Sequence, residues 1–162
     1  MLFLILLATC VMLLNILVQM GALSYSTSYL VKKHRSGQLG VTYLHDAMCM
    51  GMISVMLLVG HLVQIAFWAI AFMMCGEFEK FREAFYHSAV NFASLGYGDI
   101  VMSEQWRLLG ALQASVGVMM FGISAALLFA IISELLKTRF RDKLAQIAAA
   151  HQQLSLILGH PN

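Results

Sequence analysis

The sequence predicts an all-α membrane protein. Of its 162 residues, 60% are hydrophobic and only 11% are charged, which is more apolar surface than a water-soluble domain of this size can bury. The charges are also confined to a few short stretches. Three apolar runs of about 20 residues or more remain, the length that a membrane-spanning helix needs. We therefore expect three transmembrane helices and a multi-pass protein in contact with the lipid bilayer of the cell membrane.

The first apolar run covers residues 1–23, and we expect it to be a retained N-terminal transmembrane helix. It lacks the basic start of a signal peptide, and its apolar stretch is longer than a typical signal core. The basic stretch 24–46 follows, which we expect to be a cytoplasmic loop. Residues 47–137 contain the other two runs, at about 47 to 74 and about 108 to 136, and residues 138–162 form a polar tail.

The positions of lysine and arginine predict the orientation of the chain. These residues gather after the first run and again after the third, and basic loops stay preferentially in the cytoplasm. The connection between the second and third runs has more acidic than basic residues, with Glu77, Glu79, Glu83, Asp99 and Glu104 against Lys80, Arg82 and Arg107. We therefore expect the N-terminus outside, the C-terminus in the cytoplasm and an acidic outer vestibule. The net charge of +2 does not indicate a nucleic-acid partner.

That connection is too mixed in composition to span a membrane, so it must enter partway and return. Residues 81–93 suit a short helix, and the sequence SLGYGD follows at positions 94–99. Irregular backbone at membrane depth is tolerated only where it is buried in protein or lines water. Because Gly96 and Gly98 allow positive φ angles, successive carbonyl groups here can all turn the same way. Such a row of oxygens can hold a dehydrated cation.

SLGYGD resembles the selectivity-filter signature of potassium channels, usually written T-V/I/L-G-Y-G-D. Residues 60–136 as a whole are similar to the pore module of small bacterial potassium channels of the pore-loop family, here with an extra N-terminal transmembrane helix. The resemblance implies a homotetramer with K⁺ as the permeant ion and with no other cofactor and no small-molecule substrate. It also implies an ion-binding filter at residues 94–98, with K⁺ held by Ser94, Leu95, Gly96 and Tyr97, and Gly98 completing the loop.

The resemblance assigns roles to residues around the filter. Asp99 holds the outer filter against the short helix, and we expect Tyr86 to be its partner. Gly117 falls where the family has the hinge of its inner helix, and Gly122 is a second soft point. The alternative, that these small residues allow close helix packing, has equal weight.

Helical spacing in the third run also predicts which side chains line the pore. We expect Ser124 and Leu128 to face the axis, together with Phe121 and either Ile131 or Ile132. An apolar ring at Leu128 would then gate by dewetting.

The tail has an apolar seam that steps by alternating four and three residues, namely Phe140, Leu144, Ile147, His151, Leu154 and Leu158. This spacing predicts a helical bundle on the pore axis; an amphipathic helix on the membrane surface is the alternative. We expect His151, the titratable residue of the seam, to make such a bundle sensitive to pH.

Other functions have less support in the sequence. No nucleophile–base arrangement or carboxylate pair appears, so we do not expect an enzyme, and the histidines lack the spacing of metal ligands. His61, one helical turn from Gln64 in the second run, is expected to be neutral and hydrogen-bonded to a neighbouring chain. The alternatives to a potassium channel are a weakly selective cation channel of the same fold and a non-conducting accessory subunit or transporter component.

Overall fold

A computed structural model describes residues 2–36 and 42–157. The elements, in order, are α1 (Leu2–Arg35), α2 (Tyr43–Met74), α3 (Phe81–Phe92) and α4 (Arg107–Ile157). The described residues form no strand, and α1, α2 and α4 are each long and apolar enough to cross a membrane. The predicted all-α membrane fold is confirmed, and α3 agrees with the short helix predicted between the second and third runs.

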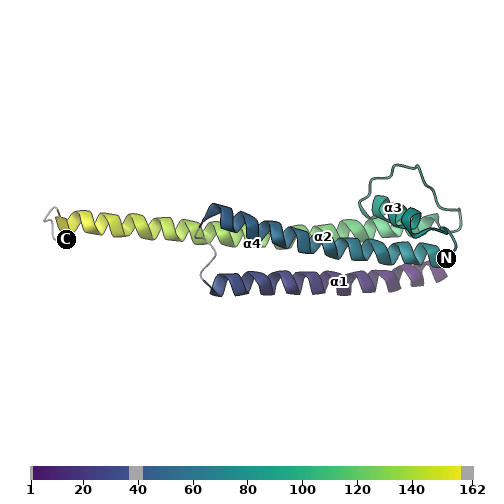
Figure 1. The fold of residues 1–162 in the computed structure, drawn as a ribbon, viewed down its shortest axis with the longest axis horizontal. Coiled ribbons are helices and arrows are strands. Elements are labelled where there is room, and N and C mark those ends of the chain that lie inside the picture. Colours follow the sequence, from purple (N-terminus) through teal and green to yellow (C-terminus); the bar gives the residue numbers. More distant parts are fainter. Residues whose placement is uncertain (1, 37–41, 158–162) are drawn as a thin grey trace.

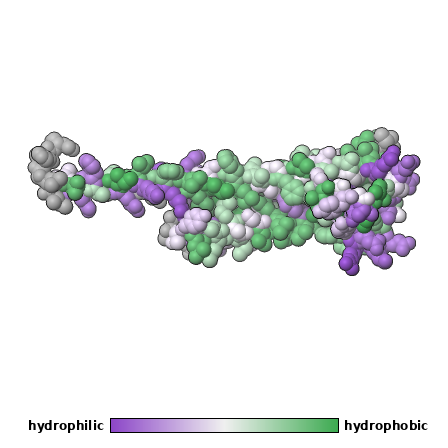
Figure 2. Space-filling view, turned by 90° about the horizontal axis from the view of Figure 1, so that it is seen from above, coloured by the Kyte–Doolittle hydropathy of each residue, from purple (hydrophilic) through white to green (hydrophobic). Residues whose placement is uncertain are grey.

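The three long helices lie lengthwise beside one another, and α3 lies at one end of this bundle (Figure 1). The start of α1 is at the same end as α3, while the end of α1 and the start of α2 are at the opposite end. From there α4 continues alone toward the C-terminus. Hydrophobic side chains cover the middle of the bundle, and hydrophilic ones gather toward its ends and along the tail (Figure 2). This is the distribution expected of a protein whose middle lies in lipid.

Two boundaries differ from the sequence prediction. Most of the stretch 24–46 is helical rather than a loop, because α1 continues to Arg35 and α2 already begins at Tyr43. No glycine or proline interrupts residues 24–35, and the Thr27 hydroxyl is satisfied by the Leu23 carbonyl one turn back, at 2.8 Å. The tail is not a separate helix either, since α4 runs through residues 137 and 138 without a break.

Two apolar clusters hold the helices together. The larger cluster lies where α3 meets the long helices, and Trp68, Phe72, Phe92, Leu109 and Met120 are fully buried in it. The smaller cluster lies toward the other end of the bundle, where it packs α2 against α4 through the buried residues Cys49, Ile53, Leu57 and Ile131.

The smaller cluster is closed by an ion pair between α4 and the first turn of α2. Arg139 Nη2 lies 2.7 Å from Asp46 Oδ2, and the guanidinium lies 5.5 Å from the centre of the Tyr43 ring. Asp46 is largely buried. This pair fixes the start of α2 against α4 just beyond the apolar part of the bundle.

Candidate functional site

The loop that carries SLGYGD leaves α3 through a reversal of the backbone. The Ser94 N–H donates to the Asn91 carbonyl and the Leu95 N–H donates to the Val90 carbonyl, both at 2.9 Å. This pair of bonds defines a Schellman motif, which places Ser94 in the left-handed conformation that usually requires glycine. Its φ is 56°, and among the described residues it is the one non-glycine with positive φ. α2 ends with the same bonding pattern, but there a glycine, Gly76, occupies the position.

The next two residues with positive φ are both glycines of the predicted filter. Gly96 has a φ of 63° and Gly98 a φ of 72°. A Cβ atom at either position would meet nothing within 4 Å, so it is the backbone conformation rather than space that favours glycine. Leu95 precedes Gly96, and Tyr97 lies between the two glycines. The large side chains of Leu95 and Tyr97 are 53% and 65% exposed, respectively, in the single chain.

Asp99 and Tyr86, the two residues predicted to support the filter, lie in contact. Tyr86 Oη donates a hydrogen bond of 2.7 Å to Asp99 Oδ2. This bond is the main reason that the pKa of the Asp99 carboxyl lies below its usual value of 3.8 and that the pKa of the Tyr86 hydroxyl lies above its usual value of 10.0. The carboxylate is thus ionised at neutral pH and ties the end of the loop to α3.

Buried hydrogen bonds fix α3 between α2 and α4. Ser88 Oγ donates to the Ile65 carbonyl of α2 at 2.7 Å. Gln113 of α4 donates from Nε2 to the Ser88 carbonyl at 3.0 Å and to Ser88 Oγ at 2.7 Å. Farther out, Glu77 Oε2 accepts a 2.8 Å bond from the Ser103 N–H, which joins the end of α2 to the turn before α4. The helix in front of the loop is therefore held from both sides.

Gly117 lies where α4 passes against the end of α3. A Cβ atom there would be 2.0 Å from the Phe92 carbonyl oxygen, closer than any two such atoms can approach. Close packing therefore requires this glycine, and α4 remains one continuous helix through it. Gly122 differs, because a Cβ there would meet nothing within 4 Å.

A polar cluster lies inside the bundle, where we predicted a pore-lining serine. Ser124 is buried rather than facing an open axis: its Oγ accepts a 2.8 Å bond from Gln19 Nε2 of α1 and lies 3.1 Å from His61 Nε2 of α2. Gln64 Nε2 donates to Gln19 Oε1 at 2.9 Å. The prediction for Ser124 is thus wrong in its helical phase. His61, predicted to bond to a neighbouring chain, has hydrogen-bond partners within its own chain.

The same phase error affects the predicted gate. Leu128 is partly buried and packs on the smaller apolar cluster, and Ile131 is 3% exposed within it. Phe129, the next residue after Leu128, is 72% exposed. Both predictions fail because α1 covers the face of α4 that contains Ser124, which the sequence analysis did not anticipate. The amides of Gln19 and Gln64 in apolar runs were the available signal.

The tail leaves its apolar residues uncovered within the single chain. Phe140, Leu144 and Ile147 are each about two-thirds exposed, at 66%, 65% and 65%, and Leu154 is 56% exposed. His151 is exposed on the same helix, whereas Leu158 lies outside the described residues. The bundle and its pH sensitivity stay predictions.

The fold defines a multi-pass α-helical membrane protein, and comparison with known families narrows this class. Residues 48–134, more than half of the chain, match the family model described as an ion channel. The chain therefore belongs to this ion channel family. Comparison with curated proteins and with solved structures gave no match.

Proposed function

We propose that four copies of the chain form a potassium-selective channel whose filter is the SLGYGD loop. The observation that carries the proposal is the pair of positive φ angles at Gly96 and Gly98 in a short loop that follows a helix held between two membrane spans. Alternate left-handed residues let the intervening carbonyl groups share one direction. Rings of such oxygens from four loops replace the water around a dehydrated K⁺, which then moves passively down its electrochemical gradient.

A fourfold assembly accounts for the surfaces that one chain leaves bare. Three large hydrophobic side chains are more than half exposed, namely Leu95 and Tyr97 of the loop and Phe129 of α4. Closed cyclic symmetry would bury such surfaces against copies of the chain around a common axis. In this arrangement Phe129, not Leu128, forms the apolar ring that gates by dewetting, and the carboxyl ends of four α3 helices direct partial negative charge toward the ion path.

Charge distribution supports the proposed orientation. The last turn of α1 contains Lys32, Lys33 and Arg35, at the end of the bundle opposite to α3 (Figure 1). With these residues in the cytoplasm, the N-terminus and the filter mouth at Asp99 lie outside. In intact cells, a membrane-impermeant thiol reagent should label a cysteine at Glu104 but not one at Ser36, in a background without the native cysteines. The opposite labelling pattern would reverse this orientation.

Alanine substitutions test the filter assignment. Gly96→Ala and Gly98→Ala should each abolish potassium flux into liposomes, because a left-handed conformation costs a residue with a Cβ about 1–2 kcal/mol and the carbonyl would turn out of its ring. Oligomer size on a sizing column should not change. Gly51→Ala in α2 is the matched control: a Cβ there meets nothing within 4 Å and the backbone is helical. Normal flux in both filter variants would rule out the assignment.

A further inference from the structure

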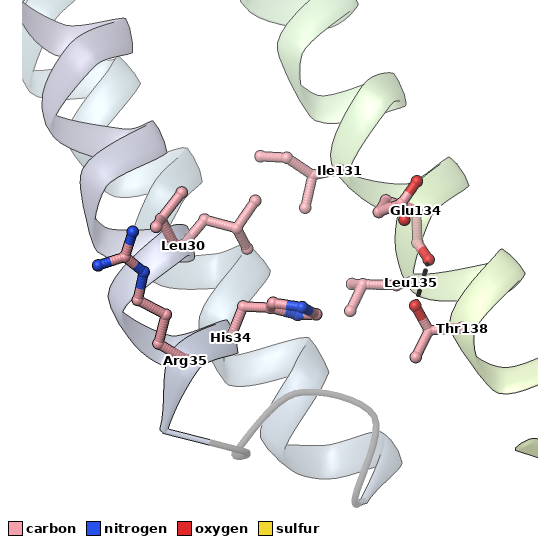
Figure 3. A pocket seen from close by; sticks show the side chains of 8 residues that line it. Leu30, His34, Arg35, Ile131, Glu134, Leu135 and Thr138 are labelled. Carbon is pink, nitrogen blue, oxygen red and sulfur yellow. Dashed lines mark hydrogen bonds between the residues drawn. The ribbon is translucent and has the colours of Figure 1, made fainter.

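A cavity of about 230 Å³ lies between the last turns of α1 and the middle of α4 (Figure 3). It is lined by Leu30, Val31, His34 and Arg35 from α1, and by Ile131, Glu134, Leu135 and Thr138 from α4. In Figure 3 the imidazole of His34 points across the gap toward α4, whereas the Arg35 guanidinium points outward from the rim. The cavity thus has an apolar interior and a polar edge.

A second hollow lies on the outer side of the same part of α1. Its lining consists of Thr27, Ser28, Val31, Lys32 and Arg35. Val31 and Arg35 line both hollows, so the two adjoin along the end of α1, and we refer to them together as the groove. One part of this groove is apolar and enclosed by two helices, and the other part is polar and basic.

The groove lies at the depth where both helices change from apolar to charged. On α1 the first charged residue is Lys32, and on α4 no charged residue lies between Arg107 and Glu134. Such a change marks the level at which hydrocarbon ends and the headgroups of a bilayer begin. A molecule bound in this groove would therefore have an apolar part at the level of the hydrocarbon and a polar part at the level of the headgroups.

The charge of the rim selects the sign of the headgroup. Lys32, Lys33 and Arg35 come together in the last turn of α1. Glu134 is the acidic residue that lines the cavity, and Lys137 lies 3.9 Å from its carboxylate, which offsets its charge. The rim is therefore positive overall, which favours an anionic headgroup.

We propose that this groove binds one anionic phospholipid from the leaflet on that side of the membrane. An acyl chain fills the cavity against Leu30, Ile131 and Leu135, and the phosphate lies at the rim beside Lys32 and Arg35. Such a lipid would join α1 to α4 at the end of the bundle opposite to α3. This inference does not depend on what the pore conducts.

The test uses the purified full-length protein in neutral detergent, with phosphatidylglycerol or phosphatidylcholine added and the bound lipids counted by native mass spectrometry. The parent should retain phosphatidylglycerol in preference to phosphatidylcholine. The Lys32→Gln, Arg35→Gln double variant should bind phosphatidylglycerol at least about tenfold more weakly, because each basic residue near the headgroup contributes about 1 kcal/mol. Lys143→Gln, an exposed basic residue of the tail, is the control and should behave as the parent.

A filling variant separates the cavity from the charged rim. Val31→Trp should remove phosphatidylglycerol binding, while Val59→Trp, at an exposed position of α2, should not. Unchanged phosphatidylglycerol binding in both the double variant and Val31→Trp would overturn the proposal. Full competition by inorganic phosphate would also overturn it, because the site would then bind an anion and not a lipid. A third outcome would also overturn the proposal: the Val31→Trp oligomer dissociates but still binds phosphatidylglycerol as the parent does. The groove would then be a contact between chains and not a lipid site.

Discussion

The side-chain amide of Gln19 in α1 donates a 2.8 Å hydrogen bond to the hydroxyl of Ser124 in α4, and both residues are buried within the bundle. The bond joins α1 directly to α4, the helix that would line the proposed pore. His61 of α2 contacts the same hydroxyl from the other side, at 3.1 Å. A movement of α4 that opened or closed the proposed pore would therefore either carry α1 with it or break this contact.

A double-mutant cycle on this pair measures how strongly α1 is joined to α4. Gln19→Leu and Ser124→Ala should each destabilise the protein, and their combined effect should be smaller than the sum. The expected coupling energy is about 0.5–1.5 kcal/mol, the range of hydrogen bonds between membrane helices. Unfolding of the detergent-solubilised protein in increasing SDS provides the free energies. Ser54→Ala is the control, because its hydroxyl is exposed and bonds to the Met50 carbonyl in its own helix. Strict additivity would show that the pair is not coupled.

Alanine at Gly117 and at Gly122 should have opposite effects on stability. At Gly117 the new methyl group would overlap the Phe92 carbonyl oxygen, and overpacking of this kind costs about 1–3 kcal/mol or more. At Gly122 the site is open, and replacement of a mid-helix glycine by alanine gains about 0.5–1 kcal/mol. Thermal unfolding of the two variants checks this. A Gly117→Ala protein as stable as the parent but altered in gating would favour the hinge interpretation over close packing.

The backbone at Ser94 predicts that threonine, the usual residue of the potassium-channel signature that this loop resembles, is less favourable here. A β-branched residue with a φ of 56° is a conformational outlier, whereas glycine is readily accepted. Ser94→Thr should therefore lower thermal stability, and Ser94→Gly should raise it while removing the hydroxyl from the loop. If Ser94→Thr is at least as stable as the parent, Ser94 does not end α3 in the left-handed conformation in the assembled protein.

The bond between Tyr86 and Asp99 should stabilise the loop over a wide but bounded range of pH. The pKa of Asp99 is depressed, so this contribution is complete above 3.8 and is lost as the pH falls through the depressed value. The pKa of Tyr86 is raised, so the contribution persists to pH 10.0 and is lost only as the pH rises past the raised value.

Thermal unfolding midpoints should show Tyr86→Phe below the parent throughout this range, with the difference shrinking in more acidic buffer. Tyr25→Phe, at an exposed position of α1, is the control. A constant difference down to about pH 2.5 would contradict the assignment.

The sequence predicted those features that depend on composition and local pattern. The three spans follow from apolar length, and the bounds of α3 follow from its position before a glycine-rich loop. The contact of Tyr86 with Asp99 was also expected, from a family resemblance. These features need no knowledge of which helix lies beside which.

The features that the sequence did not predict all depend on tertiary neighbours. Ser124 and Leu128 have the correct spacing for one face of α4, but that face is covered by α1, and only the position of Gln19 reveals it. Whether Gly117 bends or packs depends on the Phe92 carbonyl, a distance between two elements. The extension of α1 to Arg35 reflects packing of Leu30 on the smaller apolar cluster, where a basic stretch alone indicated a loop.

The most direct test of the central claim is the reversal potential of the purified protein in liposomes with potassium on one side and sodium on the other. A filter made of carbonyl rings at residues 94–98 predicts a reversal potential close to the potassium equilibrium potential, and loss of the current in Gly98→Ala. A reversal potential near zero in the parent would contradict potassium selectivity and would favour a weakly selective cation channel. No current under any gradient, from protein that is folded and oligomeric, would contradict conduction itself and would favour an accessory subunit.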